Sequence, residues 1–180
     1  MINRLCAFAV LACLSFAATA EIPLTDFTKH SLFSTVRISP DGRYFAATAP
    51  VKGKDNLVVI ERATMKPTMN LGMRAFEEVG EFTWVTNERL IFRTQRKFGS
   101  LDRPLPTGDL YAVDYNGHNQ VQLLGCAENS VCIEFGIDIV DILRDEPGSI
   151  IATQFKGGGK ANASKINIRS GKAINVGSTP

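Results

Sequence analysis

The sequence contains few of the residues from which catalytic and metal sites are built. Its 180 residues include two histidines, His30 and His118, and four cysteines. It has no Gly-x-Ser-x-Gly segment, the turn that exposes the nucleophile of many serine hydrolases. The histidines and cysteines match none of the spacings that are known for zinc sites. We therefore expect no catalytic residue, no bound metal and no cofactor in this chain.

The chain also lacks an excess of charge of one sign. It carries 20 Lys and Arg residues against 18 Asp and Glu residues, a formal net charge of +2. Such a balance provides little electrostatic attraction for nucleic acid or for an anionic membrane surface. We expect neither as a partner.

The longest apolar run lies near the N-terminus and is too short to span a bilayer. Residues 5–16 are largely apolar, follow a short positive segment and end at the small residues 17–20. This pattern is typical of a signal peptide, here residues 1–20, cleaved before Glu21. Lipid attachment through Cys13 is the less favoured alternative, because it would leave an apolar tail after the modified cysteine. We expect a bacterial protein that is exported to the periplasm or secreted, with no membrane anchor after cleavage.

Export determines how the remaining cysteines are interpreted. Once residues 1–20 are removed, Cys126 and Cys132 remain, on either side of a short loop. In an oxidising compartment, two cysteines this close are expected to form a local disulfide. The alternative is a metal site that includes His118 or His30, and their spacing is a poor match to zinc motifs.

Most of the chain consists of short runs of β-branched, aromatic and aliphatic residues, each bounded by turn residues. In the middle of the chain these runs are 82–85, 89–94, 110–114 and 120–124. Asn116-Gly117 supplies the positive φ angles that a tight hairpin turn requires. Units of the same four runs occur before and after this one. They close on Gly72, Gly125 and Gly177, about 50 residues apart.

A four-strand unit repeated with this period is typical of β-propeller blades. We therefore predict an all-β fold, a partial β-propeller of about three four-stranded antiparallel blades at 36–72, 82–125 and 137–177. A lead-in segment at 21–35 precedes them. An ordinary β-sandwich is the alternative, because its strands also come with frequent turns. The long polar connection that recurs between the second and third run of each unit favours the propeller.

Three single residues are assigned structural roles. Trp84 is expected in the core of its blade rather than on a binding surface. Asp41 is expected to bond backbone groups of its own turn. His118 follows the hairpin turn at 116–117, so a solvated turn residue is favoured over a general base.

The segment 22–27, Ile-Pro-Leu-Thr-Asp-Phe, and the Ser-Pro-Asp-Gly turn at 39–42 resemble the start of exported bacterial members of the prolyl oligopeptidase family. The segments 82–84, 89–92 and 108–114 extend this resemblance over essentially the whole chain after residue 20. These proteins are serine peptidases of the dipeptidyl aminopeptidase and acylaminoacyl peptidase type. The resemblance implies an N-terminal propeller that is followed, in the family, by an α/β-hydrolase domain.

The resemblance implies a function that this chain does not complete alone. The family's nucleophile lies in a Gly-x-Ser-x-Gly turn with Asp and His later in the chain, and no position here matches. The βαβ alternation of a hydrolase domain is also absent. We expect a non-catalytic part of a secreted serine peptidase whose intact form acts on peptides. Its missing partner is a C-terminal hydrolase domain or further blades, because propellers usually have 4–8 blades and three leave sheet edges open.

Two alternatives to this function remain. One is a stand-alone exported propeller-like module that closes its ring by oligomerisation and binds a protein partner. The other is a remnant without function.

The sequence identifies no substrate-binding residue, although it contains two groups of charged residues that invite comparison with substrate-binding sites. Some dipeptidyl peptidases hold the substrate amine with a pair of glutamates on the propeller, but the flanks of Glu77 and Glu78 do not reproduce that motif. We expect this pair in a solvated connection between the first two blades. A basic group surrounds the long connection of the second blade, where a hydrated loop is favoured over contact with a substrate carboxylate. It comprises Arg93, Arg96, Lys97 and Arg103.

Overall fold

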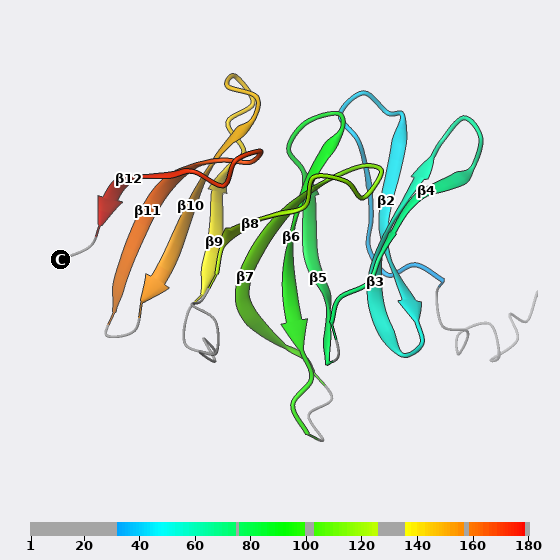
Figure 1. The fold of residues 1–180 in the computed structure, drawn as a ribbon, viewed down its shortest axis with the longest axis horizontal. Helices are drawn as coiled ribbons and strands as arrows, with labels where there is room; N and C mark the ends of the chain where they lie inside the picture. The colour runs from blue at the N-terminus through cyan, green and yellow to red at the C-terminus, as the bar shows by residue number, and fades with distance from the viewer. Residues whose placement is uncertain (1–31, 75, 100–102, 126–135, 157–158, 179–180) are drawn as a thin grey trace, which may run out of the picture. The chain divides into compact units, whose positions relative to one another are not determined.

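A computed structural model of the chain describes residues 32–74, 76–99, 103–125, 136–156 and 159–178 (Figure 1). They belong to one compact unit, Leu32–Pro180. These described residues form strands and turns and no helix, so none offers a helix that could cross a membrane. The predicted signal peptide, most of the lead-in segment, and the pair Cys126 and Cys132 lie outside the described residues.

The described residues form three four-stranded antiparallel sheets, and each sheet has its strands in sequence order. The first sheet contains β1 (Val36–Ile38), β2 (Tyr44–Val51), β3 (Lys54–Glu61) and β4 (Lys66–Leu71). The second contains β5 (Glu77–Trp84), β6 (Arg89–Arg96), β7 (Leu105–Asp114) and β8 (Val121–Leu124). The third contains β9 (Ile137–Asp141), β10 (Ser149–Lys156), β11 (Lys160–Asn167) and β12 (Ala173–Ser178). This arrangement confirms the predicted all-β, partial propeller-like fold.

The long polar connections between second and third strands are shorter than the sequence predicts. β2 and β3 pair without interruption from Tyr44–Glu61 to Val51–Lys54, which leaves only a tight turn. Both turn residues, Lys52 and Gly53, have positive φ angles. The arms of these hairpins extend beyond the apolar core, where no alternation of apolar residues is required. A prediction based on apolar runs therefore ends the strands too early.

Two apolar layers join the three sheets. One layer packs the first sheet against the second, and the other packs the second against the third. Along β6, Leu90 and Phe92 belong to the first layer and Ile91 to the second, as the two-residue period of a strand dictates. The second sheet is therefore buried on both faces, which explains the unbroken apolar run in its sequence.

A buried arginine links the second sheet to the third. Arg89 is 0% exposed, and its Nε and Nη2 atoms donate to the carbonyl oxygen of Ile168 at 2.9 and 2.8 Å. Nη1 donates to Oδ1 of Asp114 at 2.5 Å, and Nη2 also donates to the carbonyl oxygen of Asn119 at 2.9 Å. The cation is thus paired and hydrogen-bonded, the condition under which a protein tolerates a buried charge.

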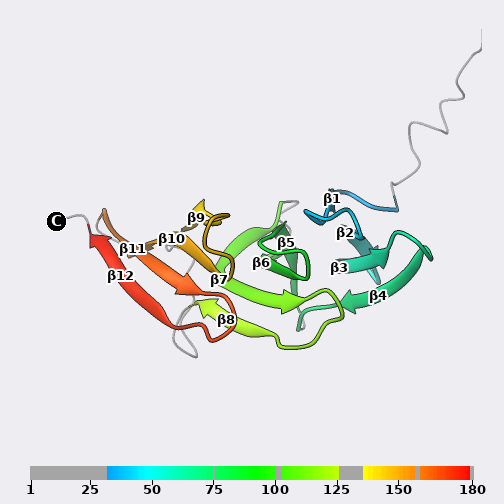
Figure 2. The same ribbon diagram turned by 90° about the horizontal axis from the view of Figure 1, so that it is seen from above.

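The first strands of the three sheets lie along the same side of the unit. Figure 2 shows β1, β5 and β9 on one side, with β4, β8 and β12 on the other. β1 and β5 are joined directly, because Nε1 of Trp84 donates to the carbonyl oxygen of Arg37 at 3.2 Å. This side is where the candidate site is found.

Candidate functional site

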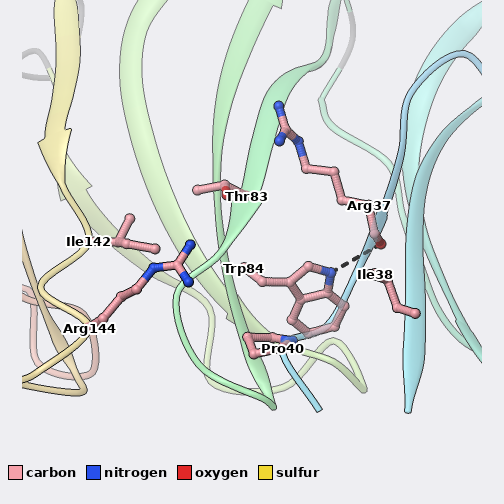
Figure 3. Close-up of a pocket in the computed structure, with 7 residues that line it drawn as sticks. All are labelled: Arg37, Ile38, Pro40, Thr83, Trp84, Ile142 and Arg144. Carbon is pink, nitrogen blue, oxygen red and sulfur yellow. Dashed lines mark hydrogen bonds between the residues drawn. The ribbon is translucent and has the colours of Figure 1, made fainter. Parts of the chain in front are cut away.

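A pocket of about 340 Å³ lies among the first strands of the three sheets (Figure 3). β1 and the turn after it, the end of β5, and the segment that follows β9 all contribute to its wall. Its lining residues are Arg37, Ile38, Pro40, Thr83, Trp84, Ile142 and Arg144. Because residues of all three sheets are needed, the pocket depends on the packing of the whole unit.

Trp84 forms part of the pocket wall while remaining in the core. Its side chain is buried at 4% exposure and stacks on Tyr44, with ring centroids 6.2 Å apart. The prediction that Trp84 belongs to the core is confirmed. The sequence did not predict that this residue also borders a pocket and fixes the backbone of Arg37 through its indole N–H group.

The Ser-Pro-Asp-Gly turn holds the pocket edge at Pro40. Asp41 Oδ1 accepts hydrogen bonds from Ser39 Oγ at 2.7 Å and from the backbone N–H group of Arg43 at 3.1 Å. The prediction for Asp41 is therefore confirmed. The Ser39 hydroxyl holds the pKa of the Asp41 carboxyl below its ordinary value. Ser39 Oγ in turn accepts from the N–H group of Tyr44 at 3.0 Å, which ties the turn to β2.

The segment after β9 reaches the pocket through a strained turn. Leu143 has a φ angle of +43°, in the left-handed region that bulky residues rarely adopt. Its N–H group donates to Asp141 Oδ1 at 2.9 Å, and its carbonyl oxygen accepts from Glu146 N at 2.9 Å. The residues on either side of Leu143, Ile142 and Arg144, both line the pocket.

The pocket carries positive charge and no carboxylate. Arg37 and Arg144 extend from opposite sides of it, with Thr83 and Trp84 between them (Figure 3). Neither guanidinium forms an ion pair with another described residue. Guanidinium groups present several N–H donors in a plane that matches carboxylate and phosphate oxygens. The arrangement is therefore suited to an anionic ligand group.

The basic residues around the long connection of the second blade lie outside the pocket. Arg93 lies on β6 with its guanidinium 3.6 Å from Glu81 and 3.7 Å from Asp138. Arg96 pairs with Glu77 at 2.5 Å. Arg93 lies in the strand predicted at 89–94, whereas the expectation of a hydrated loop is wrong for Arg96, because β6 continues through it and Glu77 neutralises it.

The other two members of that group lie beyond β6. Lys97 follows the strand directly, with Nζ 4.0 Å from Glu78. Arg103 is exposed in the connection to β7. None of the four residues lines the pocket.

The expectation that Glu77 and Glu78 lie in a solvated connection is also wrong. Both residues belong to β5, which begins at Glu77 rather than at Phe82 and pairs Glu77 with Arg96. Glu78 is 5% exposed and accepts hydrogen bonds from Gln95 Nε2 at 3.0 Å and from the N–H group of Asp55 at 3.4 Å. Both carboxylates are occupied, so the pair offers no free clamp for a substrate amine.

Burial and the Glu78 carboxylate together raise the pKa of Asp55 above its ordinary value, with burial the larger cause. The opposing charge of Lys97 reduces this shift.

The remaining candidates have structural positions. His118 is exposed in the turn between β7 and β8, where its backbone N–H group donates to Asn116 Oδ1 at 3.1 Å. The turn position predicted for it is confirmed. His30 lies outside the described residues, like the two cysteines of the predicted disulfide. Within the described part of the chain, no group of three or more His, Cys, Asp or Glu residues is arranged to hold a metal ion.

Comparison with known proteins gives likeness in fold at low identity. No protein-family model matches the chain, and no curated protein matches its sequence. A putative conserved lipoprotein from Clostridium novyi is 12% identical, with a TM-score of 0.46, over 84% of this chain and 88% of that chain. A putative 6-phosphogluconolactonase from Bacteroides uniformis is 19% identical, with a TM-score of 0.46, over 81% of this chain and 40% of that one. TolB from Acinetobacter baumannii is 18% identical, with a TM-score of 0.43, over 83% of this chain and 34% of the TolB chain.

The chain therefore spans less than half of the lactonase-like and TolB chains. Its own topology defines its class. Three four-stranded antiparallel sheets in sequence order, packed face to face through two apolar layers, make it a β-propeller-like protein.

Proposed function

We propose that this chain is the propeller portion of an exported serine peptidase, and that it positions peptides for an α/β-hydrolase domain without catalysing hydrolysis itself. The observation that carries this proposal is the pocket on the first-strand side. Propeller blades surround a central channel, and the first strand of each blade is the one nearest to it. The pocket is lined from β1, β5 and the segment that follows β9, and its position on this first-strand side supports a role in positioning peptides.

The chemistry of the pocket supports a peptide ligand. Two guanidinium groups and the Thr83 hydroxyl supply hydrogen-bond donors for carbonyl and carboxylate oxygens. The indole of Trp84 and the aliphatic side chains of Ile38 and Ile142 supply an apolar wall. The exposed lining is more polar than apolar, so the pocket is suited to a ligand with charged or hydrogen-bonding groups. The resemblance of the 39–42 turn and of the segments 82–84, 89–92 and 108–114 to the prolyl oligopeptidase family supports the peptidase assignment.

The coding DNA beyond the codon for Pro180 provides the first test. We expect further blades and a Gly-x-Ser-x-Gly segment, in frame or after one frameshift. The joined protein is then expected to hydrolyse peptides and to react with a fluorophosphonate probe, whereas the 21–180 chain does neither. Unrelated sequence after a stop codon, or labelling of the 21–180 chain itself, would refute the proposal.

A second candidate function rests on a different observation. Large apolar side chains are exposed at both ends of the row of sheets, with Val36 58% and Ile38 51% exposed on β1, and Ile174 59% and Val176 55% exposed on β12. Such surface is typical of faces that another sheet covers. It favours an exported module that closes its ring by oligomerisation and then binds a protein partner. Light scattering of the 21–180 chain tests this second function. Ring closure by oligomerisation requires one defined oligomer with a complete number of blades.

A further inference from the structure

We propose that Arg37 and Arg144 form a carboxylate site that holds the C-terminal α-carboxylate of a peptide, with the side chain of its last residue against Trp84. This inference rests on the proposed function, because it specifies which part of the peptide the first-strand pocket recognises. It assigns a role to two residues whose sequence context shows nothing unusual.

The first argument is the state of the charges. The arginines of the second sheet, Arg89, Arg93 and Arg96, each have a carboxylate within 4 Å. Arg37 and Arg144 have none among the described residues, although they line the same pocket. The two guanidinium groups lie on either side of Thr83 (Figure 3), and an anion in the pocket would compensate charges that no described carboxylate neutralises.

Two acidic residues of the connection that carries Arg144 are committed to other partners. Asp141 uses its Oδ1 to hold the N–H group of Leu143 at 2.9 Å. Glu146 forms a two-oxygen contact with Lys165 Nζ, at 2.6 and 2.7 Å. Both bonds hold the β9–β10 connection in place, and neither acid belongs to the pocket lining. Asp145, directly after Arg144, is exposed and forms no ion pair with another described residue, so the connection also carries one carboxylate without such a partner.

The second argument is the backbone at Leu143. A bulky residue with φ of +43° costs free energy, and strain of this kind persists where the surrounding structure enforces it, often at ligand sites. Here the hydrogen bonds from Leu143 N and Glu146 N enforce it. The result is that the residues on both sides of Leu143 reach the pocket, one apolar and one cationic.

The third argument concerns size and lining. A volume of about 340 Å³ is at the small end of ligand sites, which typically measure about 300–1,000 Å³. It accommodates a chain end of one or two residues rather than a long segment. Ile38, Pro40 and Ile142 provide apolar contact for the last side chain, and the Thr83 hydroxyl is available to a peptide amide or carbonyl group. A free C-terminus with an apolar last residue fits this lining.

Trp84 is the single tryptophan of the chain and lines the pocket, so its fluorescence reports directly on the site. The 21–180 chain is titrated with acetyl-Ala-Ala-Leu as the free acid, with the same peptide as its C-terminal amide, and with inorganic phosphate. We expect the acid to bind at least about 10-fold more tightly than the amide, the size of one charge-assisted interaction. Arg37→Gln and Arg144→Gln are each expected to weaken the acid about 10-fold and to leave the amide unchanged. Arg169→Gln, which changes an exposed arginine outside the pocket, is the matched control.

The outcomes separate this proposal from the function on which it rests. Equal binding of acid and amide, insensitive to both pocket variants, refutes the carboxylate site while peptide positioning stands. Binding of phosphate without binding of either peptide also refutes it, because the site then recognises a free anion. If neither peptide nor phosphate binds, the pocket is not a ligand site, and the peptidase assignment is still decided by the downstream sequence and the fluorophosphonate probe. Unchanged circular dichroism of each variant confirms that the fold is retained.

Discussion

Replacing Arg89 with methionine tests the interpretation that a buried cation joins the second and third sheets. Methionine retains the unbranched stem of arginine and removes the guanidinium group. Four hydrogen bonds disappear, two to the carbonyl oxygen of Ile168 and one each to Asp114 and the carbonyl oxygen of Asn119. The Asp114 side chain is only 14% exposed, so its carboxylate is left with little solvent and without its cation.

The expected loss of stability follows from this burial. Removing one partner of a buried, hydrogen-bonded ion pair typically costs about 3–5 kcal/mol, because the other charge is left uncompensated. Domains of this size are stable by about 5–15 kcal/mol in total. With a urea m-value of about 2 kcal/mol/M, the midpoint of unfolding should fall by about 1.5–2.5 M. Arg89→Lys should recover only part of this loss, because an ammonium group lacks the planar donors that reach three acceptors at once.

Urea unfolding followed by Trp84 fluorescence measures the effect. Arg169→Met is the control, because Arg169 is exposed in the turn between β11 and β12, next to Ile168. Asp114→Asn is a milder companion that removes the charge and keeps the shape. If Arg89→Met shifts the midpoint no more than Arg169→Met does, the guanidinium group is not a structural link and the reasoning fails.

Three further predictions concern stability. Trp84→Phe should cost about 2–3 kcal/mol in urea unfolding, because it loses the bond to the carbonyl oxygen of Arg37 and leaves a small cavity; a cost below about 1 kcal/mol would contradict this. Leu143→Asn should be neutral or stabilising by up to about 1 kcal/mol, since asparagine tolerates a left-handed φ; a clear loss would show that the leucine side chain matters more than the strain. Because burial raises the pKa of Asp55, the fold disfavours its carboxylate, and stability from this group falls as pH rises above the ordinary value of 3.8. Asp55→Asn should therefore stabilise the protein relative to wild type more at pH 7 than at pH 3, and the reverse order of midpoints would refute the assignment.

The sheets were predictable because their signals are local. Each strand of the core contains an apolar run, and turns such as Asn116-Gly117 mark where the chain reverses. The extended arms were not predictable in this way, because a hairpin that is solvated on both faces carries no apolar alternation. The error at Glu77 and Glu78 has a different cause: both continue β5 with charged side chains, and the burial of Glu78 depends on its contacts with Gln95 and Asp55, which the sequence does not reveal.

The roles of Arg89, Arg37 and Arg144 could not be predicted from the sequence, because they depend on contacts between units that are far apart along the chain. Arg89 appears in the sequence as the first residue of a strand, and arginine is ordinarily exposed. Its burial becomes evident only in the folded structure, where the carbonyl oxygen of Ile168, directly after β11, lies against its guanidinium group. Arg37 and Arg144 likewise belong to the first and third units, and only the convergence of the first strands brings them to one pocket. The sequence offered one indication: Arg37 lies in the first strand of its unit and Arg144 lies shortly after the first strand of its own unit.

The stability of the fold and the proposed binding site are connected through the third sheet. Arg37 is fixed to the second sheet by the indole of Trp84. Arg144 belongs to the connection between β9 and β10, so its position relative to Arg37 depends on how the third sheet packs against the second. The buried guanidinium of Arg89 is a directional contact at that packing surface, whereas the apolar layer around it is not directional. The proposed site takes Arg37 from one side of the packing surface and Arg144 from the other, so it requires the third sheet to keep a fixed position against the second. Apolar packing alone fixes that position less sharply than Arg89 does, because Arg89 bonds three defined acceptors.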